Sequence, residues 1–144
     1  MNSIFNENNI VLNQRFIKKN EAIEAAGKIL LEQGYVTKEY IPCMHKREEA
    51  LTTYIGNHVA IPHGINESAP YIKESGISLI QVPDGVSFGD ETAYIIIGVA
   101  GKDGSHLDIL MQLSEVIMEE ENVEKLRTAA TKEEILNIIG DLSA

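Results

Sequence analysis

The chain is poor in cysteine and in positive charge. Its 144 residues include a single cysteine, Cys43, and 12 lysines and arginines against 22 aspartates and glutamates, a formal net charge of −10. A single cysteine excludes an internal disulfide and is typical of proteins from a reducing cytoplasm. The acidic balance argues against nucleic acid and anionic membranes as partners, because both are themselves polyanionic.

Long apolar segments are missing as well. The longest core-like run, residues 94–99, is far shorter than the roughly 20 residues that a membrane-spanning helix needs. The start of the chain lacks the basic region followed by an apolar one that marks a secretory signal, and no repeat or Pro/Ser-rich linker divides the sequence. We therefore expect one cytoplasmic domain over residues 1–144, with no direct insertion into a membrane.

Two helices are predicted in the first third of the chain. The first covers residues 21–33, with Asn20 as its cap and Gly34 as its stop. The second follows Thr37, a predicted cap, and runs toward residue 47. Pro42 falls within it and removes a backbone donor just past the first turn, so we expect a distorted or later start.

Two more helices are predicted in the last third. Ser105 and Asp108, and again Thr131 and Glu134, have the spacing of a capping box. The helix after Ser105 carries apolar residues at helical spacing that we expect to face the core: Leu107, Leu110, Met111 and Met118. The helix after Thr131 is expected to contain three apolar residues, Ile135, Ile138 and Ile139, and to end at Gly140.

Strands alternate with these helices. Short apolar segments at residues 10–12 and 59–61 and the alternating segment 77–82 are predicted strands, and residues 83–85 (Pro-Asp-Gly) have the composition of a turn. Residues 94–99 are apolar without alternation, which is typical of a central strand covered on both faces. The pattern predicts an α/β fold, a three-layer sandwich of a mixed β-sheet with helices on both faces.

The most informative local feature is Pro62-His63-Gly64, directly after the predicted strand 59–61. Proline ends a strand because it has no N–H for the sheet, and glycine permits a sharp turn that leaves the imidazole uncrowded. His63 would then sit at a stiff strand end with an open side, where one ring nitrogen can act as a nucleophile. A lone histidine in such a turn can equally have no role, so the rest of the chain must decide.

Two other residues are candidates for the same site. His106 follows Ser105 and occupies a first helical position, where backbone N–H groups and the helix dipole favour an anion and disfavour a cationic imidazole. Arg47 lies at the end of the second predicted helix, a place where a cation is tolerated. Each of the two also has an ordinary interpretation as an exposed surface residue.

A metal site competes with this interpretation, because four histidines and one cysteine are present. However, Cys43-x-His45 and His58-x4-His63 do not match zinc spacings, and neither CxxC nor HExxH occurs. Cys43 has no CxxC partner or adjacent base that would activate it, which argues against a thiol enzyme. The sequence also has no Walker-type loop and no GxGxxG, which argues against nucleotide binding. We therefore predict no metal and no cofactor, while a metal- or ligand-binding module stays open as an alternative.

A long motif carries a resemblance to a known family. It reads Arg47-Glu48-x4-Thr53-Tyr54-Ile55-Gly56-x2-Val59-Ala60-Ile61-Pro62-His63-Gly64. It resembles the active-site region of enzyme IIA of the sugar phosphotransferase system, of the mannitol–fructose type, and is most similar to its mannitol members. The similarity continues through residues 85–89, 96–100 and 106–114, and it spans roughly residues 10–140.

The resemblance implies a phosphotransferase component that carries a phosphoryl group and does not itself act on sugar. In the family, the histidine of Pro-His-Gly is phosphorylated by the histidine phosphocarrier protein and passes the phosphoryl group to a cysteine of the IIB component. These roles fall here on His63, with His106 and Arg47 at the positions of the family's second histidine and arginine. The family fold, a mixed sheet between helical layers, agrees with the pattern above. A neutral imidazole is a competent nucleophile, and transfer from a phosphohistidine requires no metal.

The sequence leaves the physiological role open within this resemblance. We expect support of mannitol uptake and phosphorylation, with IIB and the IIC channel on separate chains, because this chain shows no cysteine-centred phosphate loop and no membrane span. A fructose-type or a regulatory, nitrogen-type relative that controls other proteins is the alternative. In either case we expect partners to dock on apolar residues beside His63, such as Ile61 and Ile65.

Overall fold

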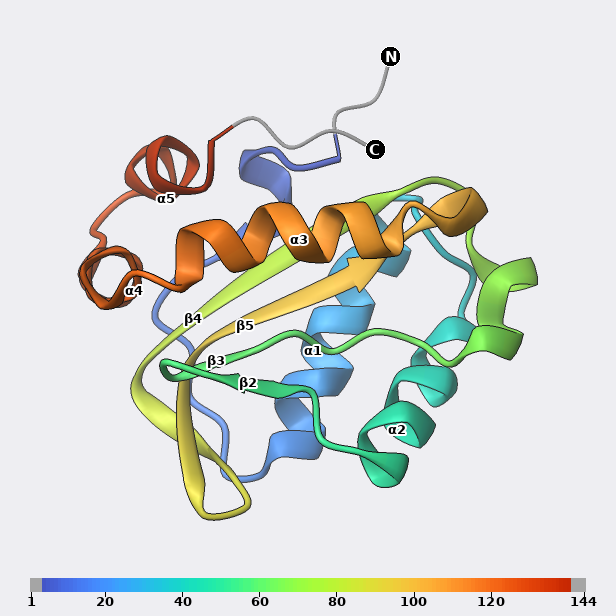
Figure 1. Ribbon diagram of the computed structural model, residues 1–144, viewed down its shortest axis with the longest axis horizontal. Coiled ribbons are helices and arrows are strands. Elements are labelled where there is room, and N and C mark those ends of the chain that lie inside the picture. Colours follow the sequence, from blue (N-terminus) through green and yellow to red (C-terminus); the bar gives the residue numbers. More distant parts are fainter. Residues whose placement is uncertain (1–3, 141–144) are drawn as a thin grey trace.

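The computed structural model describes residues 4–140 and shows a mixed β-sheet between two layers of helices (Figure 1). Within these residues the sheet has five strands in the order β1-β4-β5-β3-β2. Pairs β1–β4 and β3–β5 are parallel, whereas β4–β5 and β2–β3 are antiparallel. The strands are β1 (Ile10–Val11), β2 (Tyr54–Gly56), β3 (Val59–Ala60), β4 (Gly76–Phe88) and β5 (Glu91–Ala100).

Helices cover both faces of the sheet, which confirms the predicted three-layer architecture (Figure 1). One layer contains α1 (Lys19–Glu32) and α2 (Tyr40–Ala50). The other contains α3 (His106–Ile117), α4 (Glu120–Thr128) and α5 (Lys132–Ile139). Short 3-10 helices cover Glu7–Asn9, Asn66–Tyr71 and Lys102–Gly104. Helix α4, strand β2 and the 3-10 helix Asn66–Tyr71 are absent from the elements predicted above.

The central strand β5 explains how the two layers are held together. Its side chains alternate between two cores: Ile95, Ile97 and Val99 pack with α3, α4 and α5, whereas Ile96 and Ala100 pack with α1 and α2. All five side chains are fully buried, with 0% exposure. The strand is thus buried on both faces, as its continuous apolar sequence predicts, and the prediction for residues 94–99 is confirmed.

The first two helices begin at places the sequence analysis did not predict. Helix α1 begins at Lys19, because the Oε1 atom of Glu21 accepts hydrogen bonds from the N–H groups of Ile17 (2.9 Å) and Lys18 (3.1 Å). The predicted cap at Asn20 is therefore wrong, although Gly34 (φ 83°) does follow the end of the helix. Helix α2 begins at Tyr40, the later start that Pro42 predicted. The proline lies in the first turn, where its missing N–H costs nothing.

The predicted turn at residues 83–85 is wrong. Strand β4 runs through it to Phe88, and the extra residues form an irregularity in the register between Gln81 and Val86. Gly85 has a φ of 83° there, which a glycine adopts without strain. The chain reverses instead at Gly89 and Asp90, between β4 and β5. The Pro-Asp-Gly composition thus marks a bulge that bends the strand rather than its end.

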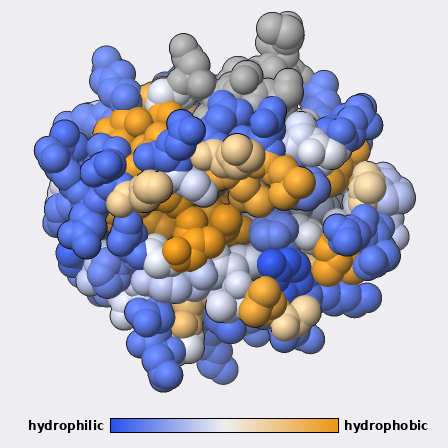
Figure 2. Space-filling model, in the orientation of Figure 1, coloured by the Kyte–Doolittle hydropathy of each residue, from blue (hydrophilic) through white to orange (hydrophobic). Residues whose placement is uncertain are grey.

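Helix α3 turns mostly different residues to the core from those predicted, of which only Leu110 packs against it. Its buried residues are Ile109, Leu113 and Ile117, whereas Leu107 and Met111 are 63% and 66% exposed. Met118, just past the helix, is 69% exposed. Both sets have helical spacing, so periodicity alone could not separate them, and contact with the β5 side of the sheet selects the first. Figure 2 shows apolar side chains gathering over α3 on this face of the molecule, amid polar ones.

The two predicted capping boxes have different outcomes. At α5, Thr131 Oγ1 accepts from the N–H of Glu134 (3.2 Å), whose carboxylate accepts from the N–H of Thr131 (3.2 Å). At α3, the hydroxyl of Ser105 is hydrogen-bonded to the hydroxyl of Ser75 (2.8 Å), so the predicted box there is wrong. The last helix ends at Gly140 (φ 76°), as predicted. Across residues 4–140, each helix is too short or too polar to cross a bilayer.

The orientation of α3 predicts unequal effects of two similar truncations. Ile109→Ala removes a fully buried side chain and should lower the free energy of unfolding by about 2–5 kcal/mol. Met111→Ala removes an exposed side chain of the same helix and should change it by no more than about 0.5 kcal/mol. Urea denaturation of both variants measures the difference. Equal losses would contradict the assigned face.

Candidate functional site

The candidate residues meet in a pocket of about 580 Å³ at one end of the sheet. Arg47, His63 and His106 all line it, although they come from α2, from the chain after β3 and from the start of α3. Tyr40, residues 64–69 and the 3-10 helix Lys102–Gly104 also line the pocket. The structure therefore brings together the three residues that the sequence analysis selected.

His63 is held by the backbone on both sides. After β3, the chain stays beside β5, because the carbonyl of Pro62 accepts from the N–H of Val99 (2.9 Å) and His63 forms a parallel bridge with Val99. The Nδ1 atom of His63 lies 2.8 Å from the carbonyl oxygen of Ile61. A carbonyl can only accept, so Nδ1 carries the proton and Nε2 presents its lone pair.

Gly64 is required for space rather than for an unusual backbone angle. A Cβ at this position would lie 2.3 Å from Ser68 Oγ and 2.7 Å from a ring carbon of Tyr40. The N–H of Gly64 donates to the Tyr40 hydroxyl (2.8 Å), which in turn donates to the carbonyl of Val99 (2.7 Å). Burial raises the pKa of Tyr40 to about 12, so the hydroxyl keeps its proton and the bridge persists at neutral pH.

The environment lowers the pKa of His63. Burial disfavours the charged imidazole most, and electrostatic interactions with Arg47 and His106 act in the same direction. The bond to the Ile61 carbonyl and the carboxylate of Glu48 oppose the shift without cancelling it. A lowered pKa keeps the ring neutral at neutral pH, which is the form with a nucleophilic nitrogen.

The start of α3 places His106 at the pocket. His106 is the first residue of the helix, where the positive end of the helix dipole favours an anion. A Cβ at Gly101 would lie 2.3 Å from the His106 Cα, so only glycine lets the helix start this close to the end of β5. The Ser75 hydroxyl secures the turn, since it accepts from the N–H of Lys102 (2.9 Å) and bonds Ser105.

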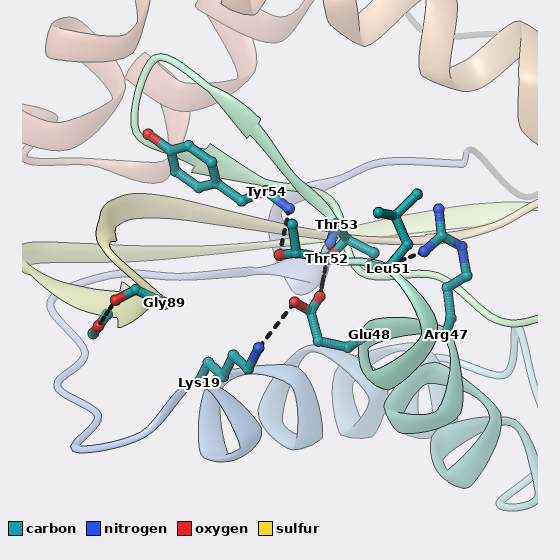
Figure 3. A network of polar contacts seen from close by, with 9 residues as sticks. Lys19, Arg47, Glu48, Leu51, Thr52, Thr53, Tyr54 and Gly89 are labelled. Atoms are coloured by element: carbon teal, nitrogen blue, oxygen red, sulfur yellow. Dashed lines mark hydrogen bonds and ion pairs between the residues drawn. The ribbon is translucent and has the colours of Figure 1, made fainter.

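Arg47 lies in the last turn of α2, and its guanidinium donates to the carbonyl of Leu51. The next residue, Glu48, points to the other side of the helix and is 4% exposed. Figure 3 shows Glu48 between Lys19 and Thr53, with Arg47 directed at Leu51. Glu48 belongs to the motif described above but was assigned no role there, because composition cannot distinguish a buried carboxylate from an exposed one.

Other metal- or anion-binding candidates are scattered. Cys43 is buried, His45 pairs with Glu24 (2.9 Å), and His58 bonds the carbonyl of Thr92 (2.8 Å). Within residues 4–140, no three His, Cys, Asp or Glu side chains are grouped so that they could hold a metal ion. Ile61 is 7% exposed and belongs to the core, so the expectation that it lines a docking patch is wrong; Ile65 does line the pocket.

The arrangement suits a small multiply charged anion covalently bound to a ring nitrogen. Nε2 of His63 is a nucleophile, and Arg47, His106 and the helix start supply positive potential around it. Planar guanidinium donors match the oxygens of a phosphoryl group.

Comparisons with known proteins place the chain among relatives. Residues 3–141 match the family described as "Phosphoenolpyruvate-dependent sugar phosphotransferase system, EIIA 2". The chain is 48% identical over 141 residues to the mannitol-specific phosphotransferase enzyme IIA component of Geobacillus stearothermophilus, covering 97% of each chain. It is 45% identical over 136 residues to the protein of that name from Bacillus subtilis, covering 94% of this chain and 95% of the other.

A solved structure is similar to the chain as well. The chain resembles enzyme IIA in the complex of the Escherichia coli mannitol enzymes IIA and phosphorylated IIB, with a TM-score of 0.90 and 32% identity, covering 94% of this chain and 96% of that one.

The lowered pKa of His63 predicts a specific response to substitution. An NMR titration should place the pKa below the ordinary value of about 6.5. Arg47→Met should raise it, because removing a nearby positive charge makes protonation easier. As a control, Lys125→Met removes a cation of an exposed pair on α4, far from the start of α3 in Figure 1, and should leave it unchanged. A wild-type pKa above 6.5, or no rise in Arg47→Met, would contradict the assigned geometry.

Proposed function

The chain belongs to the EIIA 2 family of the phosphoenolpyruvate-dependent sugar phosphotransferase system, and we propose that it is a mannitol-specific IIA component that carries a phosphoryl group on Nε2 of His63. The observation that carries the proposal is the hydrogen bond between Nδ1 of His63 and the Ile61 carbonyl (2.8 Å), since it leaves Nε2 as the reacting atom. The names of the relatives support mannitol as the sugar that the system serves.

The proposed reaction has two balanced steps. The lone pair of His63 Nε2 attacks the phosphorus of a phosphohistidine on the histidine phosphocarrier protein, and the donor's N–P bond breaks with its electron pair returning to the donor ring. A thiolate of the IIB component then attacks the phosphorus, and the bond to Nε2 breaks in the same way. His63 needs no separate base, because its Nδ1 keeps the proton throughout. The donor is already activated, so neither step requires a metal.

Arg47 and His106 act on the charge of the phosphoryl group in this proposal. Phosphoryl transfer depends on in-line positioning and on stabilising charge on the equatorial oxygens. The Arg47 guanidinium offers planar donors from one side of the pocket, and His106 with the first turn of α3 offers donors from the other. Because the same charge is present in both directions of transfer, both residues should serve the forward and the return step.

The surface around the pocket suits proteins that dock and leave. Leu107 and Met111 lie exposed on α3 beyond His106, and Ile65 lines the pocket. Apolar contacts of this kind set how long a complex lasts, while charges at the rim govern how fast it forms. The Escherichia coli structure contains phosphorylated IIB together with IIA, which supports a IIB component as the acceptor here. Both partners would meet the chain in the cytoplasm.

Substitution of the acceptor tests the carrier role. Purified His63→Gln should take up no stable phosphate from the phosphorylated phosphocarrier, whereas the wild-type chain should take up one acid-labile equivalent. Gln keeps a polar side chain of similar reach, and retention of the fold can be checked by circular dichroism. Intact mass measured after incubation gives the stoichiometry. A full equivalent on His63→Gln would overturn the assignment. A fructose-type or regulatory identity would appear as transfer to a different IIB or to none.

Substitution of the flanking residues tests the electrostatic role. Arg47→Ala and His106→Ala should each slow single-turnover transfer by about 10²- to 10³-fold, the usual loss for one donor to a developing charge. The phosphate should still arrive at His63, and return to the phosphocarrier should slow as well. Rapid-quench measurements in both directions give the rates. Wild-type rates in both variants would leave the two residues without a part in transfer.

A further inference from the structure

A continuous series of hydrogen bonds joins the end of α2 to His63. Glu48 Oε1 accepts from the N–H (2.9 Å) and the hydroxyl (2.6 Å) of Thr53. The carbonyl of Thr53 accepts from the N–H of Ile61 (3.0 Å). The carbonyl of Ile61 accepts from Nδ1–H of His63 (2.8 Å). Glu48, the residue after Arg47, is therefore linked to the imidazole through backbone and side-chain hydrogen bonds.

The buried carboxylate is costly and is nevertheless kept charged. Glu48 is 4% exposed and Thr53 is 2% exposed. Burial by itself would raise the pKa of Glu48, but hydrogen bonds from Thr52, Thr53 and Lys19 outweigh it and lower the pKa. Lys19 Nζ lies 3.3 Å from Oε2 and ties α1 into the same cluster (Figure 3). A buried ion pair adds little net stability, and this one joins the end of α2 to Thr53 and to α1.

We propose that Glu48 is a positioning residue, which fixes the Arg47 guanidinium relative to Nε2 of His63. Arg47 and Glu48 are adjacent on the last turn of α2 and bond opposite ends of the segment Leu51–Thr53, Arg47 through the Leu51 carbonyl and Glu48 through Thr53. Two such attachments set both the position and the rotation of the helix end. The inference rests on the proposed function, in which Arg47 contacts the phosphoryl group.

The effect of losing Glu48 follows from the geometry of transfer. A displacement of about 1 Å in a group that positions the reacting atoms can slow a reaction by about 10²-fold. Glu48→Gln keeps the size and one acceptor oxygen for Thr53, but it turns a donor toward Lys19 in place of an acceptor. We expect transfer to slow by about 10- to 10²-fold, which is less than for removal of Arg47 itself.

A matched control and a rescue separate this role from general damage. Glu121→Gln removes the carboxylate of an exposed pair with Lys125 on α4 and should transfer at the wild-type rate. The double variant Glu48→Gln/Lys19→Glu offers the amide an acceptor in place of the lysine and should recover most of the lost rate. Urea denaturation of every variant shows that the rates are compared between folded proteins.

A double-substitution cycle decides whether Glu48 acts through Arg47. Glu48→Gln should slow single-turnover transfer in the wild-type background and have little further effect in Arg47→Met, because no guanidinium is left to position. Equal slowing in both backgrounds, or wild-type rates for Glu48→Gln in a chain that does accept phosphate, would overturn the proposal while the proposed function stands.

A readout that needs no transfer keeps the two claims distinct. If the wild-type chain accepts no phosphate, the proposed function fails, and the Nε–H signal of Arg47 in the unphosphorylated protein still tests the positioning. We expect a single dispersed signal in the wild-type chain and in Glu121→Gln, and a shifted or averaged one in Glu48→Gln. An unchanged Arg47 signal in Glu48→Gln would show that the carboxylate does not position it.

Discussion

The hydrogen bond between Nδ1 of His63 and the Ile61 carbonyl is the interaction on which the site depends. It sets the tautomer, and thereby decides which nitrogen can react. The carbonyl is itself fixed from two sides. Ile61 bonds Thr53 through its N–H, and the adjoining Pro62 bonds β5 through its carbonyl. The hydrogen bonds of the sheet thus fix the Ile61 carbonyl, and this carbonyl fixes the orientation of the His63 imidazole.

The two helix ends at the pocket come from opposite faces of the sheet. Helix α2 packs with one core and α3 with the other. Arg47 and His106 nevertheless line the same pocket, because His63 lies beyond the end of β3, between the two helix layers. Both residues lower the pKa of His63 electrostatically, and the same groups would stabilise a phosphoryl group on it. One arrangement of charge therefore serves the empty and, on the proposed function, the loaded state.

The sequence predicted the parts of this molecule in which local chemistry and packing agree. The continuous apolar run of β5 and the capping residues of α5 gave predictions that are both confirmed. Helix α3 has two stripes of apolar residues, and contact with β5, which is not a local property, chooses between them. The Pro-Asp-Gly segment could equally form a turn or a bulge, and the pairing of β4 with β5 selects the bulge. For the site, motif and resemblance located Arg47, His63 and His106, but the burial of Glu48 depends on segments far apart in the chain.

The most direct test of the account is the identity of the phosphorylated atom. The chain would be phosphorylated by its phosphocarrier, and long-range ¹H–¹⁵N correlations with ³¹P coupling would be recorded on the imidazole of His63. The account predicts phosphorus on Nε2, with Nδ1 still protonated and bonded to the Ile61 carbonyl. Phosphorus on Nδ1, or on any residue other than His63, would contradict it.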